Sequence, residues 1–267
     1  MIFRRIQIKP GPVQRTQNRV FILRILKSNM DTIKTNLPDP AVWKILFERQ
    51  IENLQDKACR AYLDGIARIG FRADEVPTLE GISSRLTELT GWRVQRVPGI
   101  VEAGEFLRLL SQRIFPSTYF LRSMSQLDYL EEPDMFHDLF GHLPLVGDPA
   151  FSNFYEKLGR FGEKFAGNAE AIDRLERFYW YTVEFGLMEE NGNLRIYGSG
   201  ILSSYGESRF VYTDEPEIRD FDLEAILNLP FDKSQIQPIY FVVPSFDFLF
   251  EQLELLEEKV MEQASVA

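Results

Sequence analysis

Cysteine is almost absent from this chain, and histidine is nearly as rare. Cys59 is the single cysteine among 267 residues, so no internal disulfide can form, and a reducing compartment such as the cytoplasm is expected. No apolar run approaches the roughly 20 residues that a membrane-spanning helix requires, so we expect no membrane partner. Positive charge is in deficit as well, because 30 Lys and Arg stand against 40 Asp and Glu. This deficit argues against a nucleic-acid partner.

The first thirty residues differ in charge from the rest of the chain. They contain seven Arg or Lys residues, and no acidic residue precedes Asp31. We interpret residues 1–30 as a basic leader that is either disordered or, if Met30 is the true start, not translated. The alternative is a functional arm. Residues 31–267 are then expected to form a single domain.

Apolar residues recur at intervals of three and four along most of that domain, which predicts a mainly α fold with a few short β-strands. Residues 92–97 alternate like a short strand, and short strands are also expected at 195–197 and 240–243. The helices are expected at 40–54, 58–69, 82–89, 102–113, 151–165, 169–185 and 248–261, with another that starts near 132 and carries His137. No linker or repeat divides positions 40–260.

Both histidines of the chain lie in one short segment, His137-Asp-Leu-Phe-Gly-His142. Apolar residues flank it on both sides, which is typical of a dry metal pocket, although two hydrogen-bonded polar groups at a helix end are an alternative. On a straight α-helix, five residues at about 100° each would place the imidazoles roughly 140° apart. A zinc protease, with histidines four residues apart, is therefore a poor fit. Gly141 can distort the helix and turn His142 back toward His137.

A catalytic divalent ion needs a third protein ligand, and Glu184 is the best candidate among the forty acidic residues. It lies between apolar and aromatic neighbours, where an unpaired carboxylate would cost several kcal/mol. Its partner is either an arginine or a metal ion, and spacing alone leaves both open. Two histidines and one carboxylate with open positions form the facial triad of non-haem Fe(II) oxygenases.

Three blocks around these residues resemble the pterin-dependent aromatic amino acid hydroxylases, and most of all the bacterial phenylalanine 4-hydroxylases. They are residues 132–145, 179–187 and 197–207, and the likeness extends from about Asp39 to Phe250. The resemblance implies the single-domain catalytic fold of that family for residues 31–267. It also implies conversion of L-phenylalanine and O2 to L-tyrosine, with Fe(II) and tetrahydrobiopterin or a related tetrahydropterin as cofactors.

The resemblance also assigns roles to individual residues. It implies that His137, His142 and Glu184 are the iron ligands and the catalytic centre, and that Arg122 holds the substrate carboxylate. The other matches are Leu130, Pro133, Trp180, Gly200 and Ser203 for the amino-acid pocket, and Gly99, Val101, Phe106, Asp138 and Tyr179 for the pterin site. Two positions depart from the family pattern. Asp138 replaces a common glutamate, and Leu130 stands where animal members carry a threonine.

Two features of the animal members find no counterpart in the sequence. Those members add a regulatory domain and a C-terminal tetramerisation helix, whereas only about 40 residues precede the matching region of this chain and the helix expected at 248–261 is short. We therefore expect a monomer or a weak dimer. Two alternative functions remain open: the same chemistry on tryptophan or tyrosine, and metal binding without oxygenase turnover.

Overall fold

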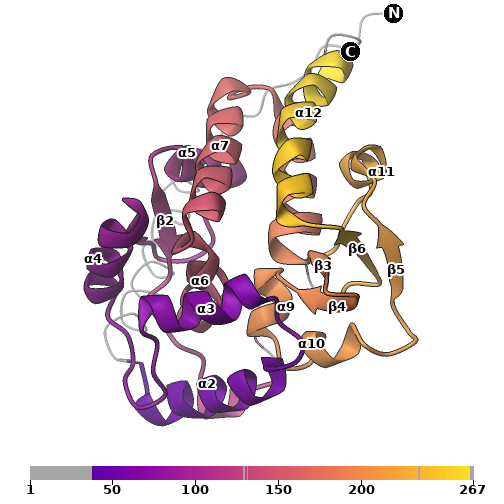
Figure 1. The fold of residues 1–267 in the computed structure, drawn as a ribbon. Helices are drawn as coiled ribbons and strands as arrows, with labels where there is room; N and C mark the ends of the chain where they lie inside the picture. Colours follow the sequence, from indigo (N-terminus) through magenta and orange to yellow (C-terminus); the bar gives the residue numbers. More distant parts are fainter. Residues whose placement is uncertain (1–37, 129, 131, 234, 265–267) are drawn as a thin grey trace, which may run out of the picture. The chain divides into compact units, whose positions relative to one another are not determined.

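Helices make up most of the chain that the computed structural model describes, namely residues 38–128, 130, 132–233 and 235–264, without the side chains of 261–264 (Figure 1). The predicted leader at 1–30 lies outside these residues. The α-helices are α2 (Pro40–Leu54), α3 (Arg60–Ile69), α4 (Leu79–Thr90), α5 (Ala103–Ser111), α6 (Leu143–Val146), α7 (Pro149–Lys164), α8 (Ala169–Tyr179), α9 (Ser199–Ser203), α10 (Glu207–Phe210), α11 (Leu223–Asn228) and α12 (Phe246–Ala264). The mainly α prediction is thus confirmed.

Capping residues in the sequence determine where several of these helices begin and end. Asp39 accepts a hydrogen bond from the backbone N–H of Ala41, and Pro40 occupies the first turn of α2. Gly70 and Gly91 follow α3 and α4 in the left-handed conformation, with φ of 86° and 75°. The start of α2 and the ends of α3 and α4 agree with the predicted limits because each depends on residues within a few positions in the sequence.

The strands form two small sheets. β1 (Arg93–Arg96) pairs in parallel with β2 (Ile114–Ser117). The second sheet has the order β4-β3-β6-β5 and consists of β3 (Leu187–Glu190), β4 (Asn193–Ile196), β5 (Glu217–Asp220) and β6 (Ile239–Val243). The sequence predicted β1, β4 and β6 but missed β2, β3 and β5. β2 contains Pro116, which has no N–H to donate and is tolerated because both strands of a two-stranded sheet have a free edge.

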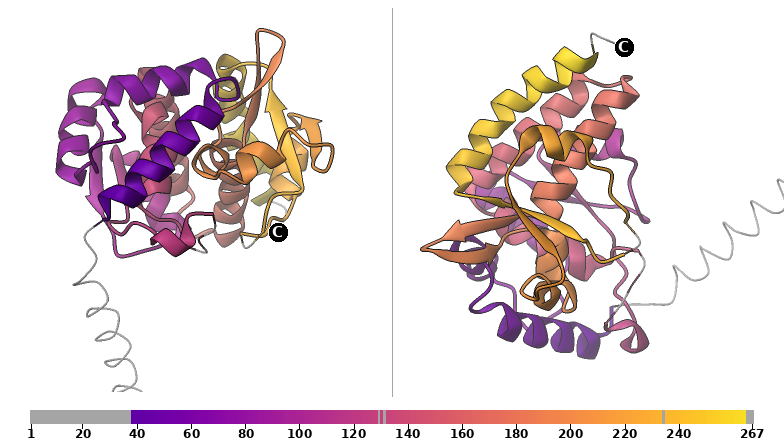
Figure 2. Two further views of the ribbon diagram at one scale, coloured as in Figure 1. Left: turned by 90° about the horizontal axis from the view of Figure 1, so that it is seen from below. Right: turned by 90° about the vertical axis from the view of Figure 1, so that its right-hand side faces the viewer.

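The C-terminal helix α12 packs beside α7 and α8 (Figures 1 and 2). Phe151 of α7 meets Phe246 and Phe250 of α12 edge to face, with ring centroids 4.3 and 5.3 Å apart. Leu249, Leu253, Leu256 and Val260 of α12 are all buried. The apolar face of α12 is therefore covered by its own chain. Among the helices described, none combines the length and apolar character needed to cross a bilayer.

Among the described residues, three helical turns depart from α geometry: η1 (Met124–Gln126) is a 3-10 turn, and the other two carry the predicted ligands. η2 (His137–His142) and η3 (Trp180–Glu184) are π-helical. η3 continues directly from α8, so the α-helix predicted for 169–185 ends at Tyr179 instead. At its end the N–H of Phe185 donates to the carbonyl of Trp180, five residues back, at 2.9 Å.

Glycines allow the elements around these turns to approach closely. A Cβ on Gly159 of α7 would lie 2.3 Å from the backbone nitrogen of Ser111, and one on Gly162 would lie 2.3 Å from Cβ of Leu107. Both contacts are with α5, so α5 is seated directly on α7. A Cβ on Gly141 would lie 2.8 Å from the carbonyl oxygen of Ser199, so α9 is similarly close to η2.

Candidate active site

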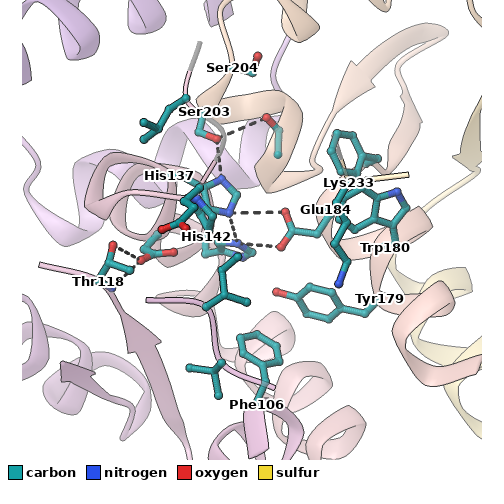
Figure 3. A pocket seen from close by; sticks show the side chains of 18 of the residues that line it. Phe106, Thr118, His137, His142, Tyr179, Trp180, Glu184, Ser203, Ser204 and Lys233 are labelled. Carbon is teal, nitrogen blue, oxygen red and sulfur yellow. Dashed lines mark hydrogen bonds and ion pairs between the residues drawn. The ribbon is translucent and has the colours of Figure 1, made fainter. Parts of the chain in front are cut away.

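Three side chains from the two π-helical turns converge on one point (Figure 3). Nε2 of His142 lies 3.1 Å from Oε1 of Glu184 and 3.2 Å from Nε2 of His137. Nε2 of His137 lies 3.8 Å from Oε2 of Glu184. The structure therefore brings together the three residues that the sequence predicted as ligands.

The π-helical turn explains how histidines five residues apart face the same point. Its i to i+5 hydrogen bonds widen the turn, so residues five apart lie on one face of it. The rings of His137 and His142 consequently have centroids 4.9 Å apart, in place of the wide separation of a straight α-helix. The sequence predicted a distortion at Gly141, and its form is this wider turn. Because Gly141 has no side chain, it mainly leaves room for the backbone of Ser199 to pack against η2.

A serine hydroxyl determines which nitrogen of His137 carries the proton. Oγ of Ser203 donates to the carbonyl of Ser199 at 2.9 Å, so its lone pairs accept from Nδ1 of His137, also at 2.9 Å. Nε2 is then left unprotonated and faces Glu184. Nδ1 of His142 lies 3.5 Å from the hydroxyl oxygen of the buried Tyr155, which can accept in the same way.

The three converging groups are one carboxylate and two imidazoles in a buried setting. Burial raises the pKa of Glu184, but the imidazoles of His142 and His137, with hydrogen bonds from His142 and Ser199, outweigh it and lower the pKa to about 2. Burial lowers the pKa of His137, so this imidazole is neutral at pH 7. Glu184 is thus an anion beside the neutral imidazole of His137, and these are the protonation states that metal binding requires.

This donor set fits a ferrous ion. Two imidazoles and one carboxylate with an open side are the ligands of non-haem Fe(II) oxygenases. Ligands at right angles around bonds of about 2.1 Å would be roughly 3.0 Å apart, close to the 3.1 and 3.2 Å separations from His142 Nε2. The buried hydroxyl of Tyr179 points toward Glu184 (Figure 3), and burial together with this carboxylate raises the pKa of Tyr179.

A cavity of about 730 Å³ opens beside the triad. Every residue that the sequence assigned to the site lines it: Gly99, Val101, Phe106, Arg122, Leu130, Pro133, His137, Asp138, His142, Tyr179, Trp180, Glu184, Gly200 and Ser203. One wall comes from residues 97–107 and from β2 to Thr118, together with Asp138 and Tyr179. The other comes from residues 122–133, η3, α9 and the segment before β6.

The first wall contains the residues expected to bind the pterin. The Phe106 ring meets Tyr179 edge to face, with centroids 5.2 Å apart. Oδ2 of Asp138 accepts hydrogen bonds from the backbone N–H of Thr118 at 2.7 Å and from its hydroxyl at 2.9 Å. Burial raises the pKa of Asp138. Thr118 was missed in the sequence because nothing marks it as the partner of a residue twenty positions away.

The second wall contains Arg122, whose guanidinium is already engaged on one edge. Its Nε and Nη2 donate to Asp134 at 2.9 and 3.0 Å, and Asp134 is completely buried. Asp134 also accepts from the backbone N–H of His137 at 3.1 Å. A substrate carboxylate would therefore meet the remaining edge of the arginine. Asp134 was missed in the sequence, although an acid directly after Pro133 and three residues before the predicted ligand His137 was a usable signal.

Known proteins resemble this chain in sequence and in structure. A family model described as biopterin-dependent aromatic amino acid hydroxylase matches residues 26–266. The chain is 42% identical over 214 residues to a phenylalanine-4-hydroxylase of Chromobacterium violaceum, covering 80% of this chain and 72% of that protein. It is 41% identical over 220 residues to one of Pseudomonas aeruginosa, covering 82% of each. A crystal structure of the Chromobacterium enzyme with iron(III) and 7,8-dihydrobiopterin superposes with a TM-score of 0.79 at 40% identity, covering 86% of this chain and 85% of that one.

Proposed function

Because the chain belongs to the biopterin-dependent aromatic amino acid hydroxylases, we propose that it converts L-phenylalanine to L-tyrosine with O2, a ferrous ion and a tetrahydropterin. Phenylalanine is the substrate named for both bacterial relatives. The observation that carries the proposal is the convergence of His137, His142 and Glu184 at the edge of a cavity lined by every other predicted site residue.

The side chains of the triad would hold the iron, and the residues around them would keep it in place. Ser203 fixes the tautomer of His137, so that the unprotonated Nε2 is the ligand atom. When bound, iron and the tetrahydropterin supply the electrons that activate O2 for transfer to the aromatic ring. The chain contributes orientation and exclusion of water.

Each wall of the cavity would bind one organic molecule. On the first wall, Phe106 offers a ring face to the pterin. On the second, Arg122 binds the substrate carboxylate through the edge that Asp134 leaves free, and a guanidinium suits this because it offers paired donors. Trp180 and Pro133 supply apolar surface for the substrate ring.

The test is turnover by the purified chain reconstituted with Fe(II), a tetrahydropterin and L-phenylalanine, with tyrosine identified chromatographically. Glu184→Gln should lose at least 100-fold in activity and fail to retain iron. Glu189→Gln, the same change at an exposed position of β3, is the matched control and should remain active. Parallel assays with L-tyrosine and L-tryptophan test the alternative substrates. Metal binding without oxidation of any of the three amino acids would refute the proposal.

We further propose that the chain acts in the cytoplasm as a monomer or weak dimer, with residues 1–30 dispensable. Its single cysteine is unpaired and buried, which suits a reducing compartment. The apolar face of α12 is covered by α7 and α8 and is not free for a coiled coil. Analytical ultracentrifugation tests the oligomeric state, and a chain starting at Met30 should retain full activity.

A further inference from the structure

Gln237, which does not line the cavity, holds the indole of Trp180 in place. The indole ring stacks on Phe231, with centroids 4.4 Å apart and planes 15° apart, and it also contacts Phe185 at 4.6 Å. Its N–H donates to Oε1 of Gln237 at 3.0 Å. The Gln237 side chain is 2% exposed, so this hydrogen bond forms away from water, where it holds more firmly.

The other end of the same amide holds the cavity loop, which we define as residues 232, 233, 235 and 236. Nε2 of Gln237 donates to the backbone carbonyls of Asp232 at 3.0 Å and Gln235 at 2.8 Å. These two acceptors use both N–H groups of the amide and leave its oxygen facing Trp180. The cavity loop supplies Lys233, Gln235 and Ile236 to the cavity lining.

The backbone of Gln237 is fixed in turn by a buried carboxylate. Its N–H donates to Oε1 of Glu207 at 3.0 Å, and the hydroxyl of Tyr240 donates to the same oxygen. Glu207 is 6% exposed and lies at the start of α10, so Gln237 is anchored to an element outside the loop. The amide therefore connects three parts of the structure, which are η3, the cavity loop and α10.

A second link between the cavity loop and α8 is much weaker. Nζ of Lys233 pairs with Glu176 at 2.6 Å, but the two side chains are 61% and 31% exposed. An ion pair at such a position contributes little because water and salt screen it. The buried amide of Gln237 is therefore the stronger of the two connections that hold the cavity loop to the helix formed by α8 and η3.

We propose that Gln237 is a positioning residue for the aromatic amino acid. It holds the Trp180 indole and the cavity loop in the arrangement that receives the substrate ring. This inference rests on the proposed function, since it takes the wall containing Trp180 as the substrate side. Gln237 contacts neither the triad nor the pterin side, so its loss should affect the amino acid and leave metal and pterin binding intact.

The test compares Gln237→Leu with Gln55→Leu, the same change at an exposed residue after α2. Gln237→Leu removes the hydrogen bond to the indole and both side-chain hydrogen bonds to the cavity loop, and we expect it to raise KM for L-phenylalanine about tenfold. The tyrosine formed per pterin oxidised should fall as well. The pterin KM and the dissociation constant of Co(II), a spectroscopic probe of the triad, should stay within twofold of wild type. Gln55→Leu should match wild type in all four.

Trp180→Phe provides a second route, because it keeps an aromatic ring and removes the N–H while leaving Gln237 in place. If Gln237 acts through the indole, the two substitutions combined should raise KM by much less than the product of their separate effects. Multiplicative effects would overturn the proposal. So would an unchanged KM for phenylalanine, or a loss of metal and pterin affinity as large as the loss for phenylalanine.

A measurement without turnover separates this inference from the proposed function. In the metal-free protein, amide hydrogen exchange over residues 232–240 should be at least tenfold faster in Gln237→Leu than in Gln55→Leu. If the wild type forms no tyrosine but exchange accelerates as expected, the proposed function is wrong, while Gln237 still holds the cavity loop. If the wild type is active and exchange is unchanged, only the proposed role of Gln237 is wrong.

Discussion

At the scale of single residues, the hydroxyl of Ser203 binds Nδ1 of His137, on the side of the ring away from the proposed metal site. Ser203→Ala removes the acceptor that holds Nδ1 of His137, so the proton is no longer confined to that nitrogen. We expect metal affinity to fall 10- to 100-fold, as is usual when a ligand histidine loses its outer partner. Titration with Co(II) against a competing chelator measures it. Ser84→Ala, the same change at an exposed position in α4, is the control. Equal affinity in both variants would limit Ser203 to lining the cavity.

The triad could be predicted from the sequence, but the buried partners of Arg122 and Trp180 were missed. His137 and His142 are the only histidines, which marks their segment, whereas Glu184 was a candidate from its aromatic setting that only the family resemblance made a ligand. Asp134 and Gln237 are ordinary polar residues in the sequence. Their importance comes from being buried beside Arg122 and Trp180, and this depends on tertiary packing.

At the scale of elements, the contact between α5 and α7 supports the first wall of the cavity, where we propose that the pterin binds. Gly159→Ala would place a methyl group against the backbone of α5, which must shift and carry Phe106 with it. We expect a several-fold higher KM for the tetrahydropterin and a loss of about 1–3 kcal/mol in the free energy of unfolding, as overpacking usually costs. The dissociation constant of Co(II) should change little, because the triad lies on other elements.

The matched control is Glu163→Ala, at an exposed position of the same helix. Steady-state kinetics with varied pterin and urea unfolding measure the two effects. A normal pterin KM together with the expected loss of stability would mean that α5 moves without displacing Phe106. The α5–α7 contact would then stabilise the fold without positioning the pterin.

The helices were largely predictable, and the π-helical turns were not. Helix limits follow from local residues such as Asp39, Pro40 and Gly70, each of which acts within a few positions. A π turn differs from an α turn only by one residue in hydrogen-bond spacing, and three- and four-residue periodicity does not register it. The missed strands β2, β3 and β5 are as long as the predicted β1 and β4, but they contain residues that are uncommon in strands: Pro116 in β2, and two acidic residues each in β3 and β5.

At the scale of the whole molecule, the stability of the metal-free protein should depend on pH through His137. Burial lowers the pKa of His137 in the folded state, whereas its pKa in the unfolded chain is near 6.5. At a pH between these two values, the unfolded chain binds a proton that the folded protein does not. Stability is therefore complete above pH 6.5 and decreases as the pH falls, by up to about 1.4 kcal/mol per pH unit. Glu184, with a pKa of about 2, stays ionised throughout this range.

Urea unfolding at pH 7.5, 6.5 and 5.5 in the presence of a chelator measures this dependence. His137→Gln, which cannot titrate, should show a smaller decrease between pH 6.5 and 5.5 than the wild type. Identical decreases in the two proteins would assign the acid sensitivity to other groups.

The two walls of the cavity are built from different sets of residues, and this has a consequence for how specificity can change. Residues 97–118 with Asp138 and Tyr179 form the first wall, and residues 122–133 and 180–207 with the cavity loop form most of the second. Variation confined to the second set, with Glu184 and Ser203 kept, is expected to alter which amino acid is accepted while the proposed reductant site stays the same. A mutant library aimed at new aromatic substrates can therefore leave the first set untouched and be screened with one unchanged pterin.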